Sequence, residues 1–233
     1  LERELACAYL QSGIGMDYFE AMCACANYAF ANRQLATYWT RKVFEDALKR
    51  KAEEMEIQLV YDIAHNIAKE EEHVVEGKRR KLCVHRKGAT RAFPAGDERL
   101  PPIYQSVGQP VLIPGSMGTR SFLAVGTEVA KDETFGSCAH GSGRELSRTA
   151  AMRKYRGSDV KEALEKRNII VKARERGKGD VRMKRGVPFD RYGELAEEVA
   201  AAYKDPEVVV RSCEIAGIAK RVAAFRPIAV IKG

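Results

Sequence analysis

The chain has 233 residues, enough to bury a substantial core as one large domain or two small ones. Its apolar and charged fractions, 45% and 31%, are those of a soluble globular protein and argue against overall disorder. The net charge of +8, with a pI near 9.2, favours polyanionic partners: nucleic acid, nucleotides or an anionic membrane surface. No apolar run approaches the roughly 20 residues of a membrane span, and no signal-like opening is present. The sequence therefore predicts a cytoplasmic protein without a membrane partner.

The sequence begins at Leu1, inside a polar, helix-like segment and without an initiator methionine, so we expect the later part of a longer polypeptide. The six cysteines form no C-x-x-C pair, which disfavours a zinc or disulfide framework. Free thiols are typical of a reducing compartment. Cys23 and Cys25 fall in a helical pattern and are expected to be small buried residues.

A long N-terminal helix is predicted over residues 16–50, where apolar residues recur with a period near 3.6. The next segment, Glu56–His65, can be drawn as a continued helix, but its β-branched and aromatic residues favour a strand. Residues 81–86 predict a short strand. The prolines and glycine of residues 92–103 then predict a long irregular stretch.

Two short apolar strands, 109–114 and 121–127, are predicted on either side of a glycine-rich connection. Further elements are predicted as helices over 144–155, 159–167, 190–203 and 207–216, a flexible basic loop over 174–185, and strand-like sequence over 222–232. Strands and helices are mixed without a regular βαβ rhythm or an internal repeat. The predicted fold class is α+β, and the sequence leaves its topology open.

The first glycine-rich loop, PGSMGTRS over 114–121, follows an apolar strand. Its glycines would let backbone N–H groups approach a phosphate, and Arg120 adds positive charge. A tight hairpin with polar residues for solubility is the simpler reading of these residues. A G-x-x-G loop of the KH type is disfavoured, because that loop joins two helices.

The second loop, CAHGSGR over 138–144, sets His140 beside two glycines and before a predicted helix. A helix N-terminus suits a phosphate or an anionic intermediate, and Arg144 and Arg148 would lie on one helix face. A mostly neutral imidazole can act as nucleophile, base or metal ligand. These residues alone support a chemical role and a surface histidine in a capping turn equally.

The remaining histidines are weaker candidates. His65 ends an apolar segment and precedes Asn66, a common place for a metal ligand, although a hydrogen-bonded core histidine is the commoner case. His73 follows three glutamates and is read as a solvated loop residue. His85 precedes a small basic cluster in which Lys87 could contact RNA.

Four ordered blocks of sequence resemble the RtcB family of RNA-splicing ligases. They are YDIAHN at 61–66, HRKGATRAFP at 85–94, IPGSMGTRSFLAVG at 113–126 and SCAHGSGRELSR at 137–148. The closing RPIAVIKG at 226–233 is similar to the family's end. The resemblance covers essentially the whole chain. It implies an RtcB-like α+β fold, with residues 1–233 as the C-terminal portion of a single RNA-ligase catalytic domain.

The resemblance implies an enzyme that uses GTP and manganese to join an RNA 3′-phosphate or 2′,3′-cyclic phosphate to a 5′-hydroxyl. His140 would be the nucleophile that carries GMP, His65 a metal ligand, and Arg144, Arg148 and Lys87 contacts to phosphates or RNA. The implied guanosine site consists of His65, Asn66, Pro114, Gly115, Ser116, Met117, Ser121, His140, Gly141, Ser142, Gly143, Tyr203 and Lys232. Tyr203 would stack on the guanine. The implied partners are RNA, as tRNA halves or broken ends, and GTP, and an activating protein cofactor is left open.

The sequence departs from the family pattern in two ways. The family's other manganese ligands, an Asp-x-x-Cys motif and two further histidines, have no counterpart here, so we expect one metal ligand and most of the guanylate pocket in this chain. Ser142 stands where alanine is also familiar, a change expected to be tolerated. Two other readings stay open: a non-catalytic RNA-binding protein, and another phosphohistidine phosphoryl-transfer enzyme.

Overall fold

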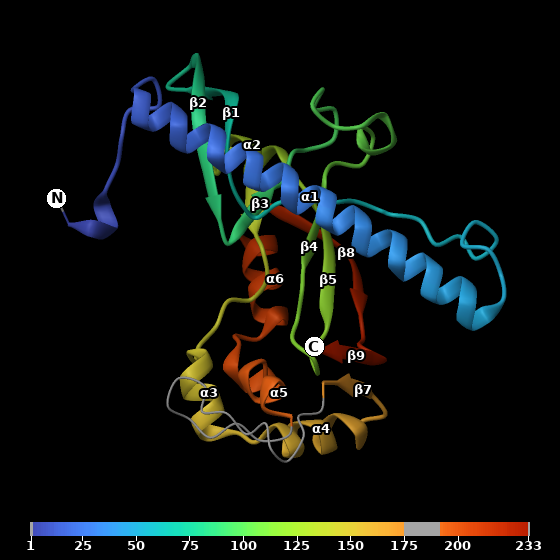
Figure 1. Cartoon of the computed structure of the whole chain (residues 1–233). Coiled ribbons are helices and arrows are strands. Elements are labelled where there is room, and N and C mark those ends of the chain that lie inside the picture. The colour runs from blue at the N-terminus through green and yellow to red at the C-terminus, as the bar shows by residue number, and fades with distance from the viewer. Residues whose placement is uncertain (1, 175–191, 233) are drawn as a thin grey trace. The chain divides into compact units, whose positions relative to one another are not determined.

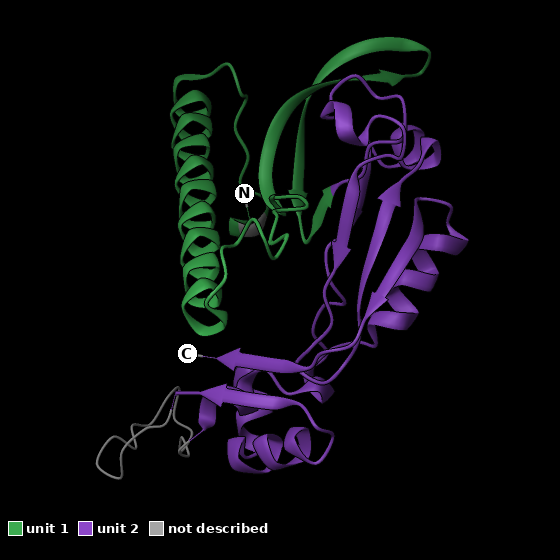
Figure 2. Cartoon of the chain, turned by 90° about the vertical axis from the view of Figure 1, so that its right-hand side faces the viewer, with its two compact units in different colours: residues 1–90 green, residues 91–233 purple. Residues whose placement is uncertain are grey.

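The computed structural model describes residues 2–174 and 192–232 of the chain. These residues form two compact units, residues 1–90 and residues 91–233 (Figure 2). Helices and short, mostly antiparallel strands are mixed in the chain, which confirms the predicted α+β class (Figure 1). None of the helices in the described part of the chain combines the length and apolar character needed to cross a membrane.

The first unit begins with a short 3-10 helix, η1 (Arg3–Leu5), and is dominated by the long helix α1 (Gly13–Leu48). The Ser12 side chain caps its start by accepting from the Gly15 N–H, and Lys49 ends it in the left-handed region at φ 54°. The helix predicted over 16–50 is confirmed. Its apolar side chains are largely exposed, Trp39 at 59% among them. The expected burial of Cys23 and Cys25 is wrong, because Cys23 is half-buried and Cys25 is exposed.

The strand predicted over 56–65 is wrong. This segment is irregular, and Glu56 lies in the left-handed region at φ 53°. Arginine side chains of α1 hold it: Arg41 Nε donates to the Ile57 carbonyl at 3.0 Å, and Arg33 Nε contacts Asp62 Oδ1 at 2.6 Å. Side-chain contacts thus replace the strand partner that the sequence pattern suggested.

An antiparallel hairpin of β1 (Asn66–Val75) and β2 (Lys78–Lys87) completes the first unit. The strand predicted over 81–86 is confirmed and is longer than expected.

The reading of His73 as a solvated loop residue is wrong, because it lies in β1 with its side chain buried. Arg86 Nη1 and Nη2 each donate to one oxygen of the buried Glu71 carboxylate at 2.8 Å. The same carboxylate lies 3.0 Å from His73 Nε2. Alternate polar residues of β1, Glu71 and His73, can therefore be buried because they pair with Arg86 and with each other. A short strand, β3 (Ala89–Arg91), spans the boundary to the second unit.

The second unit is built on a three-stranded antiparallel sheet. Its order is β4 (Pro110–Ile113), β5 (Ser121–Gly126) and β8 (Ala219–Phe225), so the two predicted apolar strands are confirmed as a hairpin. The helices α2 (Glu128–Glu133) and α6 (Pro206–Ile215) flank it, and α6 confirms the helix predicted over 207–216. The core between them includes Ile113, Phe122 and Val210, all fully buried, together with Cys138 of the short strand β6 (Ser137–Ala139).

A second apolar core gathers the remaining elements of this unit. They are α3 (Arg148–Lys154), α4 (Gly157–Glu165), α5 (Gly193–Glu197), the 3-10 helix η3 (Ala200–Ala202), and the parallel pair β7 (Ile170–Ala173) and β9 (Ala229–Lys232). The helix predicted over 159–167 is confirmed as α4, and β8 and β9 confirm the strand character of 222–232. The irregular stretch predicted over 92–103 is also confirmed, with one short 3-10 helix, η2 (Pro102–Tyr104). The basic loop predicted over 174–185 lies outside the described residues from 175 onward.

Two predicted helices differ from those observed. The helix expected over 144–155 begins only at Arg148, because the Glu145 and Leu146 N–H groups donate to the Ala202 carbonyl instead. In the described part of the stretch expected as a helix over 190–203, only the short α5 and η3 form. In both cases, bonds between distant segments replace the local bonds that a continuous helix needs.

Candidate functional site

The loop that joins β4 to β5 is closed by its own hydroxyl groups. The Gly115 N–H donates to Ser121 Oγ at 3.0 Å, and the Ser116 N–H donates to Thr119 Oγ1 at 2.7 Å. A side chain at Gly115 would collide with the Arg120 carbonyl, so the turn requires glycine. The amides of Gly115 and Ser116 are therefore paired within the loop. The Gly115 amide is thus used inside the loop rather than offered to a phosphate, whereas the expectation for the Gly118 amide stays a prediction.

The His140 loop adjoins this first loop. The strand β6 leads into His140, and Cys138, two residues earlier, is anchored in the core. Gly141 has a φ of +77°, and a Cβ built there would lie 3.6 Å from Pro114 Cγ, so the two glycine loops are in contact. His140 is half-buried, and Ser142 is buried at 7% exposure. The left-handed glycine lets the chain turn directly after the histidine while packing against Pro114.

The expected helix N-terminus at His140 is absent. The first helix after the loop is α3, whose cap is Ser147, seven residues beyond the histidine. Arg144 therefore precedes the helix, and the prediction that Arg144 and Arg148 share one helix face is wrong. Helix-dipole stabilisation of a ligand fades within the first turn, so this loop must bind any anion through side chains and loop amides.

Arg144 is nevertheless tightly held, by a segment near the end of the chain. Its Nη1 donates to the Tyr203 hydroxyl at 2.6 Å and to Glu198 Oε2 at 3.3 Å, and its Nη2 donates to the Glu197 carbonyl at 2.6 Å. The guanidinium also lies over the Tyr203 ring, 4.6 Å from its centroid. Arg144 and Tyr203 form an isolated antiparallel bridge, and the Lys204 N–H donates to the Gly143 carbonyl at 3.1 Å. The His140 loop is thereby joined to residues 202–204 by backbone and side-chain bonds.

Glu198 is the centre of this cluster. Its carboxylate accepts from Arg144, from the Tyr203 hydroxyl and, at 3.3 Å, from Arg148 Nε. Burial tends to raise the pKa of Glu198, but the Tyr203 hydrogen bond and the charges of Lys232 and Arg144 outweigh it, so the pKa is lowered. Burial, and next the contact with Glu198, raise the pKa of the Tyr203 hydroxyl. At neutral pH the cluster thus holds an ionised carboxylate between cations and a neutral phenol.

Sequence reasoning missed Glu198 and its neighbour Glu197, whose carboxylate lies 3.8 Å from Arg148 Nε. Both stand in the run ELAEEVAAAY, which resembles the solvated face of a helix. Lys232, whose charge helps to lower the pKa of Glu198, lies on β9, which is held by pairing with β7 and by the Arg174 N–H bonded to the Lys232 carbonyl at 3.0 Å. The second unit therefore brings together the predicted residues Arg144, Arg148, Tyr203 and Lys232, and it packs the loop at Pro114 against the His140 loop.

The first unit gathers three further predicted residues at one end of its hairpin. Asn66 is directly opposite Lys87 in the strand register, and the Gly88 N–H donates to the His65 carbonyl at 3.1 Å. His65 is half-buried, whereas Asn66 and Lys87 are exposed. A half-buried imidazole on a fixed backbone suits a metal ion, and no group of three or more potential ligands occurs among residues 2–174 and 192–232.

In the second unit of this α+β fold, a glycine-flanked histidine, a hydroxyl-rich loop and two arginines lie in adjoining segments, and these are residue types that can bind phosphate groups. The family model described as "tRNA-splicing ligase RtcB" matches residues 1–233, so the chain belongs to the RtcB family. Over the whole chain it is 52% identical to the tRNA-splicing ligase RtcB of Thermococcus kodakarensis and 49% identical to that of Methanococcus maripaludis, and it covers 45% of each. It is 48% identical to the RtcB of Methanocaldococcus jannaschii, of which it covers 22%. The chain thus spans less than half the length of these relatives.

Proposed function

We propose that this chain forms the histidine-bearing part of a GTP-dependent RNA ligase, which joins an RNA 3′-phosphate or 2′,3′-cyclic phosphate to a 5′-hydroxyl in tRNA splicing or RNA repair. Membership of the RtcB family supports the class of reaction. The single structural observation that carries the proposal is the His140 loop, packed against Pro114 and bonded to the segment that holds Tyr203 and Glu198. A surface histidine in a capping turn would not need these contacts.

In the proposed first step, an imidazole nitrogen of His140 attacks the α-phosphorus of GTP. A P–N bond forms, the bond from the α-phosphorus to the bridging oxygen breaks, and pyrophosphate leaves. GMP then passes from His140 to an oxygen of the RNA 3′-phosphate, which restores the imidazole and turns that phosphate into an activated anhydride. The 5′-hydroxyl attacks the RNA phosphorus last, giving a phosphodiester and releasing GMP. A 2′,3′-cyclic end must first be opened by water to the 3′-phosphate.

The residues of the second unit divide this work by chemistry. The hydroxyl groups of Ser116 and Ser121 can donate to oxygens of the nucleotide, as can the amides of the His140 loop. Arg144, half-buried and fixed in place, can oppose the charge that develops on the transferring phosphoryl group. One face of Tyr203 is covered by Arg144, so guanine would stack on the opposite face.

The first unit would contribute His65 as one manganese ligand, Asn66 as a nucleotide contact and Lys87 as an RNA contact. Manganese, when bound, would neutralise charge on phosphate oxygens. The remaining ligands would come from the part of the relatives that this chain does not span. Because Lys87 and Arg148 are exposed cations, we expect RNA binding that weakens as the salt concentration rises.

The decisive experiment uses a protein as long as the curated relatives, of which this chain spans less than half, and incubates it with manganese and GTP labelled on the α-phosphate. We expect a covalent label that is stable to alkali, labile to acid and lost in His140→Ala. His85→Ala, which alters an exposed histidine of the first unit, serves as the matched control and should label fully. Equal labelling of His140→Ala would refute the proposed nucleophile.

The same experiment separates the other two readings. RNA affinity that is indifferent to GTP and manganese, with no label on any histidine, would favour a non-catalytic RNA-binding protein. A histidine label obtained equally well from ATP and GTP would favour another phosphohistidine transferase.

A further inference from the structure

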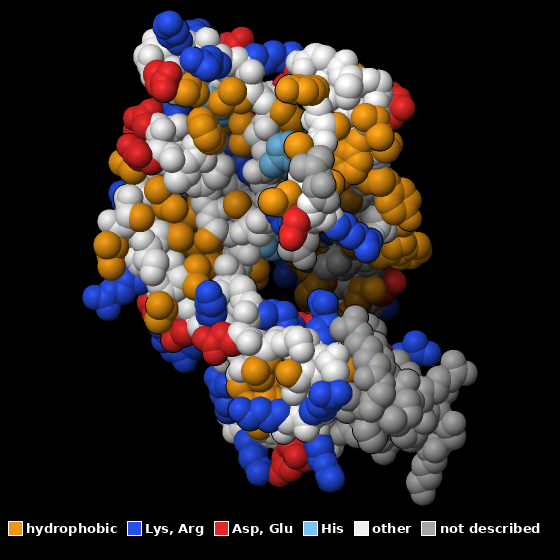
Figure 3. All heavy atoms as spheres, turned by 90° about the vertical axis from the view of Figure 1, so that its left-hand side faces the viewer, with side chains coloured by type: hydrophobic (Ala, Val, Ile, Leu, Met, Phe, Trp, Pro, Cys, Tyr) orange, Lys and Arg blue, Asp and Glu red, His pale blue; other side chains and the backbone are white. Residues whose placement is uncertain are grey.

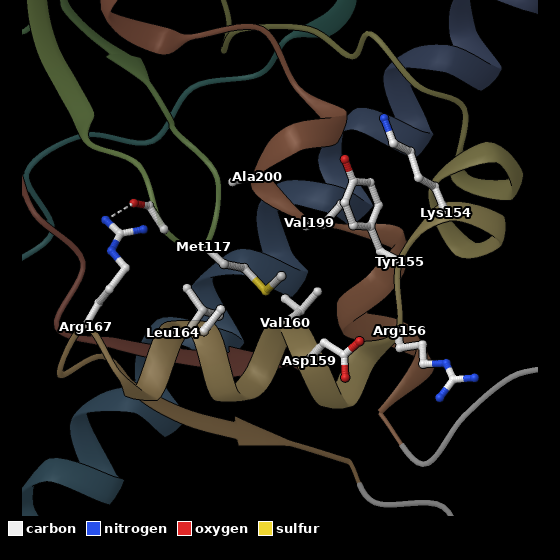
Figure 4. Close-up of a pocket in the computed structure, with 12 residues that line it drawn as sticks. Met117, Lys154, Tyr155, Arg156, Asp159, Val160, Leu164, Arg167, Val199 and Ala200 are labelled. Carbon is white, nitrogen blue, oxygen red and sulfur yellow. Dashed lines mark hydrogen bonds between the residues drawn. The ribbon is translucent and has the colours of Figure 1, made fainter.

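A cavity of about 470 Å³ opens in the second unit, beside the residues already described (Figure 4). Met117, Val160, Leu164 and Val199 form its apolar walls, and Met117 lies over Val160 and Leu164 of α4 (Figure 4). Val160 and Leu164 belong to the second apolar core, so this wall of the cavity is formed by well-packed residues. Its volume is within the range that accepts a small organic group such as a nucleobase.

The mouth of the cavity is basic. Lys154 and Arg156 are exposed there, and neither has a carboxylate partner in the described part of the chain. A third cation, Arg167, is fixed because its Nη2 donates to the Gly118 carbonyl at 2.7 Å (Figure 4). Over the lower end of the molecule, Lys and Arg side chains surround an apolar patch (Figure 3). An apolar occupant that carries negative charge at its edge would match these features.

Tyr155 supplies the aromatic surface of the cavity. It is half-buried at the end of α3, where its N–H donates to the Ala151 carbonyl at 2.9 Å. Lys154 Nζ lies 5.5 Å from the centroid of its ring. Asp159 is the single carboxylate among the lining residues. It accepts from Ser158 at 3.3 Å through Oδ1, which leaves Oδ2 for an N–H donor of an occupant.

The cavity shares a wall with the proposed nucleotide site. Met117 and Gly118 line it, and they belong to the same loop as Pro114, which packs against Gly141 beside His140. The loop that lines the cavity is therefore the same loop that contacts the His140 loop. This placement distinguishes the cavity from a remote surface hollow.

We propose that this cavity is a subsite for one base of the single-stranded RNA end that is to be joined, an inference that rests on the proposed ligase function. The base would stack on Tyr155 against the apolar wall, with Asp159 accepting from its N–H edge. The flanking phosphates would contact Lys154 and Arg156. A flat ring linked to phosphates matches both the apolar walls and the basic mouth of the cavity. Proteins that bind single strands without sequence preference combine these same two features, aromatic stacking and a cationic groove.

The test measures the binding of a short single-stranded RNA with a 3′-phosphate to the complete protein, by fluorescence anisotropy. Tyr155→Leu keeps apolar volume but removes the stacking surface, and we expect affinity to fall about tenfold, which corresponds to about 1.4 kcal/mol. Tyr155→Phe should bind like the wild type. Lys154→Gln and Arg156→Gln should each lower the salt dependence of binding by about one phosphate contact.

The matched control is Arg153→Gln, which removes an equal charge from an exposed neighbour that does not line the cavity. It should leave RNA affinity nearly unchanged. GTP labelling of His140 is measured in parallel for every variant and should stay normal. If Tyr155→Leu lowers the melting temperature, the salt dependence of RNA binding in Lys154→Gln and Arg156→Gln decides the question.

Unchanged RNA affinity in Tyr155→Leu and Lys154→Gln would overturn the subsite. So would a parallel loss of GTP labelling, because the cavity would then hold the guanosine nucleotide. Failure of the ligase proposal looks different, since the wild-type protein itself would then carry no GMP label.

Discussion

Two carboxylate–arginine clusters, one in each unit, use similar residues in different environments. In the first unit, Glu71, His73 and Arg86 have side-chain exposures of 4%, 3% and 1%. In the second unit, Glu198 and Arg144 are 18% and 21% exposed, and they share the Tyr203 hydroxyl. The first cluster is buried on the β1–β2 hairpin, whereas the second is partly open to solvent beside the His140 loop.

The difference in burial implies a difference in role. A fully buried ion pair loses most of its attraction to desolvation, but removing one partner leaves an unpaired charge inside the protein. Such a cluster is sensitive to mutation mainly through folding. A partly exposed cluster gives up less hydration, and its groups can exchange contacts with a ligand. We therefore expect the first cluster to govern stability and the second to govern activity.

The largest effect is expected at Glu71. Glu71→Gln leaves the Arg86 guanidinium buried without its carboxylate, and removing one partner of such a pair typically costs about 3–5 kcal/mol. We expect earlier urea unfolding of the complete protein and faster hydrogen exchange in β1 and β2. Glu72→Gln, at the adjacent exposed position, is the control and should be neutral. Wild-type exchange in Glu71→Gln would show that the buried cluster does not hold the hairpin.

A smaller effect of a different kind is expected at Glu198. Glu198→Gln removes the charge shared by Arg144, Arg148 and Lys232 and weakens the bond from Tyr203. Hydrogen bonds to charged groups contribute about 1.5–3 kcal/mol, so we expect kcat for RNA joining to fall at least tenfold. Unfolding should change little. RNA affinity should hold or improve, because negative charge is lost.

This split between kcat and affinity distinguishes positioning from a purely structural role. Glu198→Asp, which keeps the charge, should recover part of the activity. Glu133→Gln, an exposed carboxylate on α2, is the matched control. If Glu198→Gln unfolded as early as Glu71→Gln, the proposed contrast between the two clusters would be lost.

Local patterns predicted the elements whose stability is local. Helix α1, the β4–β5 hairpin and α6 follow from periodicity, turn glycines and caps, and all three occur close to their expected bounds. The family resemblance pointed to the two glycine loops. The structure adds that these loops are in contact, through Gly141 and Pro114.

Elements decided by distant contacts could not be predicted. The start of α3 depends on the Ala202 carbonyl, and the shape of residues 56–65 depends on arginines of α1. Glu198 was missed because its partners come from segments up to 54 residues away in sequence. Likewise, the charges of Glu71 and Arg86 indicated solvent, and only their pairing 15 residues apart explains their burial.

Asp97 offers an intermediate case and the smallest expected effect. Its side chain is 4% exposed, but its partner Arg99 is 32% exposed, with contacts of 2.7 and 2.6 Å between them. The Arg99 hydrogen bonds outweigh burial and lower the pKa of Asp97 to about 2. Because the folded-state pKa lies below the unfolded value near 3.9, the stabilisation is complete above about pH 4. It is lost as the pH falls toward 2.

We therefore expect Asp97→Asn to lower the free energy of unfolding by about 1 kcal/mol at pH 6, since solvent around Arg99 screens the pair. The difference from the wild type should shrink as unfolding is measured at successively lower pH. Asp132→Asn, on the exposed face of α2, should show no such trend. A cost at pH 6 as large as that of Glu71→Gln would mean that burial of the carboxylate alone sets the energy. A cost near 1 kcal/mol would mean that the exposure of Arg99 limits the stabilisation from the pair. The same difference in exposure separates the buried cluster at Glu71 from the partly exposed cluster at Glu198.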